Sequence, residues 1–225
     1  MNHQSMFGDR PTILITAGPT REAIDPVRYI TNRSSGKMGY ALASAAAKQG
    51  YHVILISGPT LLDIPDSVDF IPVETALEMY DTVNHHIGKA DIAIFAAAVA
   101  DYRPAVIPEH KIKKSTERLT IEFIRNPDIL GSARKTFGFM GVLVGFAAET
   151  EHLEDNAHHK LTSKGCDFVV ANDVSRKDIG FDTHENEIIL VFPETTEFPP
   201  KDSKYELALV ILEHAVKLAS VRNTN

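Results

Sequence analysis

The chain has 225 residues, 44% of them hydrophobic, and its 23 basic and 30 acidic residues give a formal net charge of −7. That length allows one large domain or two small ones, with a core that needs no disulfide or metal. Proteins that coat duplex nucleic acid or membrane surfaces are usually basic, so the charge disfavours both classes. A single cysteine, Cys166, excludes an intramolecular disulfide and a cysteine-rich zinc site.

No apolar run reaches the roughly 20 residues that a membrane-spanning helix needs. Residues 1–10 are polar and lack the hydrophobic segment of a signal peptide, so we expect a flexible lead-in on a cytoplasmic protein. A single domain is expected over 11–221, with 222–225 as a tail.

Strand-like and helix-like patterns alternate along most of the chain. Short β-branched or apolar runs bounded by turn residues predict the strands, which we place at 12–17, 52–57, 68–73, 91–97, 141–146, 167–171 and 187–192. Apolar residues at helical spacing predict helices between them. The first helix begins near Met38 and stops at Gly50, and another is expected over 150–163.

Two further helices carry clearer signals. Thr75 and Glu78 form a capping box, which predicts the start of a helix there. Its apolar stripe is expected at Leu77, Tyr80, Val83 and Ile87. A closing helix is marked by Leu207, Ile211, Ala215 and Leu218.

The stretch 101–126 interrupts this rhythm, with lysines at 111, 113 and 114 ahead of an alternating segment at 119–124. We expect an inserted flap region here. Elsewhere, nearly continuous apolar strands separated by helices predict a mainly parallel sheet covered on both faces. The fold class is therefore α/β, Rossmann-like and doubly wound.

Tests for common nucleotide motifs fail. No G-x-G-x-x-G follows the first strand, and the second strand ends at Ser57-Gly58-Pro59 without an acid for a ribose hydroxyl. These absences argue against a nicotinamide-dependent oxidoreductase, which remains the alternative enzyme class. A non-catalytic module for single-stranded nucleic acid is disfavoured by the negative charge and the absence of tryptophan.

The segment 32–39 (NRSSGKMG) precedes a predicted helix. Free amides, two hydroxyls and the helix dipole make such a turn a site for anions. Ordinary capping by Ser34 or Ser35 explains the same residues, so both interpretations stay open at this point.

Eight segments, in order and spacing, resemble phosphopantothenoylcysteine synthetase in its bacterial, CTP-using form. They are 17–22 (AGPTRE), 25–28 (DPVR), 31–39 (TNRSSGKMG), 97–104 (AAVADYRP), 111–114 (KIKK), 126–129 (NPDI), 145–150 (GFAAET) and 171–174 (ANDV). The resemblance implies a ligase of coenzyme A biosynthesis that joins phosphopantothenate to L-cysteine through an acyl-cytidylate, releasing pyrophosphate and CMP. It also implies Mg²⁺ as cofactor, a homodimer, and a functional link to a phosphopantothenoylcysteine decarboxylase, with no nucleic-acid or membrane partner.

The resemblance assigns roles to particular residues. It makes Asn32 and Lys111 catalytic, Asn32 by polarising the acyl carbonyl and Lys111 by contacting CTP. Substrate binding is expected at Arg28, Asn32, Ser34, Ser35, Gly36, Lys37, Ala97 and Ala98. CTP binding is expected at Asp101, Lys111, Asn126, Pro127, Asp128, Ile129, Phe146, Lys160 and Lys164.

Without the resemblance, these residues have plainer explanations. The lysines suit a solvated surface, Phe146 suits a core, and Arg28 suits an interface salt bridge. Asp101 is the one candidate ligand for a metal, because the ten histidines show no zinc-site spacing. The sequence does not indicate which residues bind cysteine.

Overall fold

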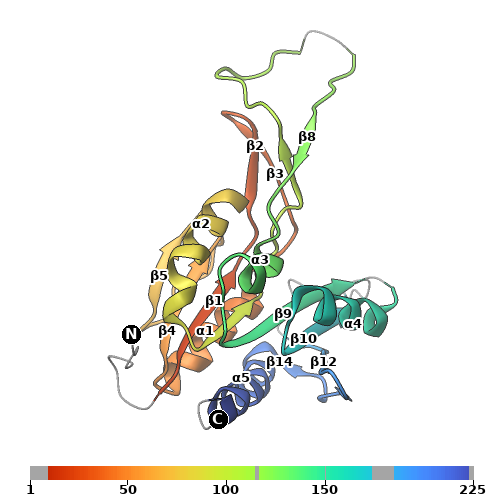
Figure 1. Cartoon of the computed structure of the whole chain (residues 1–225). Coiled ribbons are helices and arrows are strands. Elements are labelled where there is room, and N and C mark those ends of the chain that lie inside the picture. The colour runs from red at the N-terminus through yellow and green to blue at the C-terminus, as the bar shows by residue number, and fades with distance from the viewer. Residues whose placement is uncertain (1–9, 115–116, 150, 174–184, 223–225) are drawn as a thin grey trace.

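The computed structural model describes residues 10–114, 117–149, 151–173 and 185–222, and its centre is an eight-stranded sheet (Figure 1). The strand order is β13-β12-β10-β9-β6-β1-β4-β5. The strands are β1 (Thr12–Ala17), β4 (His52–Ser57), β5 (Asp69–Pro72), β6 (Ile92–Phe95), β9 (Val142–Glu149), β10 (Phe168–Asp173), β12 (Ile189–Val191) and β13 (Thr196–Glu197). Neighbours from β10 to β5 pair in parallel, whereas β12 and β13 are antiparallel.

Helices cover both faces of the sheet, as predicted. They are α1 (Lys37–Lys48), α2 (Ala76–His86), η1 (Ile87–Lys89), α3 (Ile129–Lys135), α4 (Leu153–Lys164) and α5 (Lys204–Arg222). Helices α1 and α5 bury their apolar sides in one core, while α2, α3 and α4 bury theirs in the other. The doubly wound α/β fold is therefore confirmed. No helix in the described part of the chain is both long and apolar enough to cross a membrane.

The strand order reverses between β1 and β6, because the chain builds outward from β1 to β4 and β5 and then returns to β6. In such sheets the carboxyl ends of the two central strands diverge and leave a crevice for ligands. The fold thus places the segments after Ala17 and after Phe95 at one ligand-binding edge.

The helix α2 begins as predicted, and its predicted apolar stripe faces the core except at one position. The capping box of Thr75 and Glu78 is present. The predicted stripe is wrong at Leu77, which is 40% exposed, and the buried positions are Ala76, Met79, Val83 and Ile87. The other three predicted positions do contact the core, because Val83 and Ile87 are buried and Tyr80 is partly buried against it.

A projecting arm was not predicted as strands. It consists of two antiparallel pairs, β2 (Arg21–Asp25) with β3 (Arg28–Thr31) and β7 (Tyr102–Pro104) with β8 (Phe123–Arg125), together with the described residues between β7 and β8. We call these elements the arm. Figure 1 shows it extending away from the sheet, at the end opposite α5.

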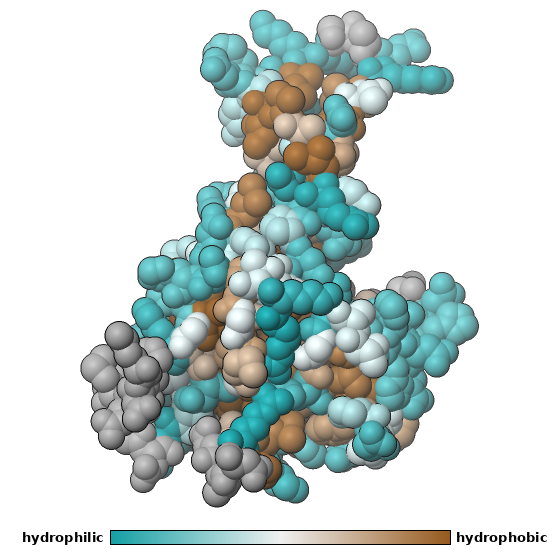
Figure 2. Space-filling view, in the orientation of Figure 1, coloured by the Kyte–Doolittle hydropathy of each residue, from teal (hydrophilic) through white to brown (hydrophobic). Residues whose placement is uncertain are grey.

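The arm carries hydrophobic side chains that water reaches (Figure 2). Exposed examples are Val27, Tyr29, Val106, Ile107, Leu119, Phe123 and Ile124. An unpartnered apolar surface of this kind marks an interaction site more often than chance exposure. A third short pair, β11 (Glu185–Asn186) with β14 (Asp202–Ser203), lies beside the start of α5.

The ends of the predicted domain are partly described. Arg10 donates to the carbonyl of Gln49, and α5 extends to Arg222, which the expected tail had included. Residues 1–9 and 223–225 of the expected lead-in and tail lie outside the described residues.

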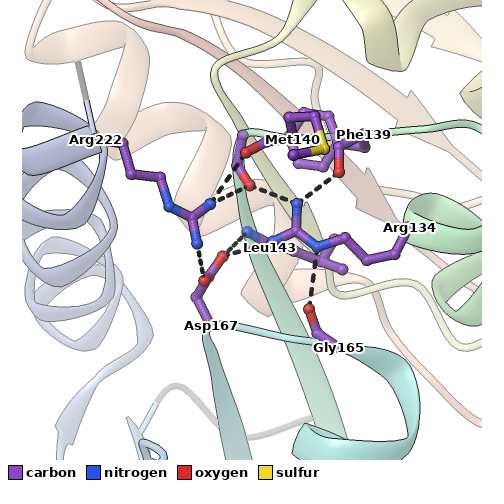
Figure 3. Close-up of polar contacts among 8 residues, drawn as sticks. Arg134, Phe139, Met140, Leu143, Gly165, Asp167 and Arg222 are labelled. Atoms are coloured by element: carbon purple, nitrogen blue, oxygen red, sulfur yellow. Dashed lines mark hydrogen bonds and ion pairs between the residues drawn. The ribbon is translucent and has the colours of Figure 1, made fainter. Parts of the chain in front are cut away.

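Two arginines and one aspartate form a polar cluster at the end of the sheet opposite the crevice, where β9 and β10 begin (Figure 3). Arg134 Nη2 donates to Asp167 Oδ2 at 2.8 Å, and Arg222 pairs with Asp167 Oδ1. Both guanidinium groups also donate to the carbonyl of Gly141, at 2.8 and 2.6 Å. Burial lowers the pKa of Arg134, and the charge of Asp167 opposes that effect. The cluster thus links α3, α5 and the starts of β9 and β10.

Replacement of Asp167 tests this cluster. Asp167→Asn leaves the half-buried Arg134 without its counter-charge and should lower the free energy of unfolding by about 2 kcal/mol, since the pair is partly exposed. Urea denaturation followed by circular dichroism measures this loss. The matched change at the exposed Asp66, Asp66→Asn, should stay within about 0.5 kcal/mol. Equal stability of the two variants would contradict the prediction.

Candidate functional site

A small chamber lies at the predicted crevice. Its volume is about 120 Å³. The first turn of α1 and the segment after β6 form two of its walls, and β9 and β10 contribute a third. Seven residues predicted from the sequence line it: Ser34, Ser35, Gly36, Lys37, Ala97, Ala98 and Phe146. We call this space the chamber.

The N-terminus of α1 opens into the chamber without a side-chain cap. Gly36 is the N-cap residue, with φ of 77°, and the first turn holds no acidic side chain. Ser34 Oγ instead accepts from the amide of Gly36 at 3.3 Å. By contrast, Thr75 caps α2 and Asp128 caps α3. A helix N-terminus without a side-chain cap can bind an anion, which is the first of the two interpretations of this segment.

Asn32 lies at the rim of the chamber in a defined orientation. Its Nδ2 donates to the carbonyls of Ala98 and Val99, at 3.1 and 3.2 Å. The amide is thereby held beside a chamber wall, although the side chain is exposed. A substrate carbonyl that uses the same donor must replace one of these two carbonyls.

Two predicted lysines contact predicted nucleotide-binding residues. Lys160 Nζ donates to the carbonyl of Phe146 at 2.8 Å, and Lys164 Nζ to Asp128 Oδ2 at 2.5 Å. Burial lowers the pKa of Lys160, and Glu149 counteracts part of this. Burial would raise the pKa of Asp128, but the bonds from Lys164 and the Gly131 amide outweigh it and lower that pKa.

Asn126 and Ile129 point their side chains into the protein. Asn126 Nδ2 donates to the carbonyl of Ala100 at 2.8 Å, and its Oδ1 accepts from Arg103 at 2.9 Å. Ile129 is buried in the core, and Pro127 is half-buried. Any nucleotide contact at Asn126 or Ile129 therefore comes from the backbone. The amide of Asn126 also donates to the carbonyl of Asp101 at 2.8 Å, which positions that residue.

Asp101 and Cys166 are the side chains to consider for metal binding and for thiol chemistry. Asp101 is exposed, and no group of three or more histidine, cysteine, aspartate or glutamate side chains gathers as a metal site within the described ranges. Burial raises the pKa of Cys166 to about 12, so this residue remains a thiol and is a poor nucleophile.

The arm holds the remaining predicted residues apart from the chamber. Arg28, Lys111, Lys113 and Lys114 line a separate groove of about 640 Å³. Within one chain, the structure does not bring Lys111 to the chamber wall with Asn32 and Phe146. Figure 1 shows the segment between β7 and β8 at the far end of the arm.

One buried carboxylate organises this groove. Asp25 accepts from Arg28 Nε at 3.0 Å, from the amide of Val27 at 3.0 Å and from the amide of Ile112 at 3.1 Å. The bonds from Arg28 hold the pKa of Asp25 well below its usual range, although burial acts in the opposite direction. Asp25 therefore ties the lysine segment to the β2–β3 hairpin.

Sequence reasoning missed five residues near these sites. Glu22 is buried, and its Oε1 accepts from the amide of Ala76 at the start of α2, at 2.9 Å. Burial raises the pKa of Glu22 despite this bond. Glu22, Asp25 and Asn172 were only part of motifs and had no assigned role, whereas Asn186 and Lys204 line the chamber without any sequence signal.

Comparisons with known proteins agree on one family. The model for the DNA/pantothenate metabolism flavoprotein C-terminal domain matches residues 9–218. The chain is 50% identical over 204 residues to the coenzyme A biosynthesis bifunctional protein CoaBC of Vibrio vulnificus strain YJ016, covering 90% of this chain and 51% of that protein. With CoaBC of Escherichia coli strain K12 it shares 43% over 214 residues, covering 94% and 53%.

A solved structure resembles the whole fold. The crystal structure of the C-terminal domain of CoaBC matches with a TM-score of 0.78 and 38% identity, covering 96% of this chain and 97% of that one. The chain spans about half the length of the curated relatives it matches.

The anchor at Asp25 can be tested directly. Asp25→Asn should release the lysine segment, so that trypsin cleaves after Lys111, Lys113 and Lys114 several-fold faster, while Asp63→Asn on an exposed loop should not. Because the folded pKa is depressed, the anchor is fully present above the ordinary value of about 3.9 and is lost only as pH falls through the lower one. Hydrogen exchange should therefore find the Ile112 amide still protected at about pH 4; loss of protection there would contradict the assignment.

Proposed function

The chain belongs to the family of the DNA/pantothenate metabolism flavoprotein C-terminal domain, and on that basis we propose that it is a CTP-dependent phosphopantothenate–cysteine ligase. Its reaction supplies phosphopantothenoylcysteine to coenzyme A biosynthesis. The observation that carries the proposal is the uncapped N-terminus of α1 in a chamber whose rim holds Asn32. This arrangement combines an anion site with an amide donor at the topological switch point.

The first step forms the acyl-cytidylate. The carboxylate oxygen of phosphopantothenate attacks the α-phosphorus of CTP, and pyrophosphate leaves with the electrons of the broken P–O bond. Such transfers depend on positioning and on neutralising charge around the phosphates. First-turn amides of α1, together with Lys160 and Lys164, supply positive potential on this side of the site.

Magnesium fits the site as a companion of the nucleotide. It prefers oxygen ligands and usually binds through one or two carboxylates plus substrate phosphates. Asp101, exposed at the crevice edge, is the carboxylate available for that role. The ion would offset charge on the phosphates during the first step.

The second step forms the amide bond. The amine nitrogen of cysteine attacks the acyl carbon, CMP departs with the electrons of the C–O bond, and the nitrogen loses one proton to solvent. Negative charge develops on the acyl oxygen. The Nδ2 of Asn32 can stabilise that charge once it exchanges its bond to Ala98 or Val99 for the substrate.

The arm supports a homodimer. Its exposed apolar side chains need a partner, and its groove with Arg28 and Lys111 lies away from the chamber of the same chain. We propose that each arm carries these cations to the site of the other subunit.

The synthetase would also work together with a decarboxylase activity, because its relatives are bifunctional proteins about twice as long. A cytoplasmic location suits the buried, unpaired Cys166.

The oxidoreductase alternative meets an obstacle after β1. The ribose of a bound dinucleotide would lie beside the end of the second strand, β4, but there the backbone of Gly58 lies against the backbone of Pro19. A Cβ at Gly58 would lie 1.9 Å from the carbonyl oxygen of Pro19, so the two loops are in close contact. We therefore retain the ligase as the proposed function.

Pyrophosphate release tests the proposal. Release should require phosphopantothenate, Mg²⁺ and CTP, with ATP much less effective, and CMP formation should require cysteine in addition. Asn32→Asp should still release pyrophosphate but slow amide formation by about 100-fold, because a carboxylate opposes the developing charge. Rapid-quench assays separate the two steps. Absence of CTP-dependent release from the unmodified chain would refute the ligase.

Subunit mixing tests the role of the arm. Lys111→Gln and Asn32→Asp should each be weakly active alone. An equal mixture should recover about a quarter of the normal activity, since half the dimers are mixed and each of these holds one intact site. No recovery in a mixture shown to exchange subunits would place Lys111 in the site of its own chain.

A further inference from the structure

A buried carboxylate without an assigned role lies where the arm joins the sheet (Figure 1). Glu22 is the second residue of β2 and is 2% exposed. Its Oε1 accepts from the amide of Ala76 at 2.9 Å, which holds the carboxylate against the start of α2. The amide of Arg21 donates to the carbonyl of Glu74 at 2.8 Å. The base of the arm is therefore fixed to the body on both sides of this residue.

The groups that bond to Glu22 are donors. Besides the amide of Ala76, the side chains of Thr20 and Asn126 form hydrogen bonds with the carboxylate, and the charge of Arg103 acts on it. Burial raises the pKa of Glu22, and these partners oppose that effect. An ionised carboxylate has two acceptor oxygens and no donor, so it can satisfy several donors at once. A glutamine at the same position would turn an NH₂ group toward some of them.

Glu22 and Arg103 together fix the orientation of Asn126. A guanidinium only donates, so the acceptor Oδ1 of Asn126 faces Arg103, at 2.9 Å from its Nη1. The Nδ2 of Asn126 then points to the carbonyl of Ala100, at 2.8 Å, and toward Glu22. Asn126 is 6% exposed, so water does not replace these partners easily. A flipped amide would place donor against donor and acceptor against acceptor.

The same residues hold the segment 98–101 in place. The amide of Ala100 donates to Thr20 Oγ1 at 2.9 Å, and its carbonyl accepts from Asn126. The carbonyl of Asp101 accepts from the Asn126 amide at 2.8 Å. Because Thr20 Oγ1 accepts from Ala100, the proton of this hydroxyl can go to Glu22. Both side chains that hold Ala100 are thus held by Glu22 in turn.

This segment carries groups that the proposed reaction uses. The carbonyls of Ala98 and Val99 orient Asn32, at 3.1 and 3.2 Å. Asp101 is the carboxylate proposed for Mg²⁺, and Asn126 begins the turn at which CTP is expected. A shift of the backbone here would therefore move groups that belong to both steps.

We propose that Glu22 is a positioning residue of the ligase reaction and acts along two branches. Through Thr20 it fixes the segment that orients Asn32 for amide formation. Through Asn126, with Arg103, it fixes the turn at which CTP binds. This inference rests on the proposed function, which supplies the reaction.

Kinetics of Glu22→Gln test the role. This variant keeps the size of the side chain and an acceptor for Ala76. It should raise the KM for CTP and slow amide formation, each about tenfold, as expected for one lost hydrogen bond to a charged group. Glu78→Ala removes half of the capping box of the same helix and should lower the melting temperature by a few degrees without changing either quantity. Equal kinetic changes in the two variants would show a merely structural role and overturn the proposal.

The two branches can be separated. Thr20→Val keeps the shape of the side chain and should slow amide formation about tenfold, with the KM for CTP within about twofold. Arg103→Met should give the opposite pattern. Adding Arg103→Met to Glu22→Gln should raise the KM for CTP little further, because both changes release the same amide of Asn126. Effects on this KM that multiply would refute the second branch.

Hydrogen exchange reads the network without the reaction. In Glu22→Gln the amides of Ala100 and Asn126 should exchange about tenfold faster, while that of Ile94 in β6 should not change. If the unmodified chain releases no CTP-dependent pyrophosphate, the ligase proposal fails. If the unmodified chain is active and Glu22→Gln matches it in exchange or in kinetics, the positioning role fails.

Discussion

The close approach of α1 to the end of β1 sets the geometry of the site. A Cβ at Gly39 would lie 2.5 Å from the Cβ of Ala17, and one at Gly36 would lie 2.8 Å from a methyl carbon of Thr60. Larger residues would push the helix away from the sheet. Because the helix lies so close, its uncapped amides face the crevice where the strand order reverses, and Asn32 is carried to the carbonyls of Ala98 and Val99.

The same arrangement divides the cations of an acidic chain into two groups. Lys160, Lys164 and the α1 terminus lie on the body, while Arg28 and Lys111 lie on the arm. Like charges gathered on one rigid surface would repel one another, so their placement on a projecting segment lowers this repulsion. Asp25 maintains this separation, because its buried carboxylate accepts from the Ile112 amide and holds the lysine segment in place.

Hydrophobic pattern was enough to predict the body of the fold, because β1 and β4 are almost entirely buried and their ends coincide with the predicted 12–17 and 52–57. It failed for β3, whose residues are mostly exposed and therefore show no inward-facing alternation. The polar anchor of Asp25 joins Val27 and Ile112 across a long stretch of sequence, which no local pattern records.

The site residues that the sequence predicted and those that it missed differ in the same way, in local pattern against long-range contact. The family motifs identified the residues after β1 and β6, because those contacts are local to a glycine-rich turn and a strand end. Asn186 and Lys204 reach the chamber through the pairing of β11 with β14 and the packing of α5 on α1, so in the sequence they look like ordinary polar residues near turns. Tertiary packing, rather than any motif, creates a buried acceptor and a buried cation within one small space.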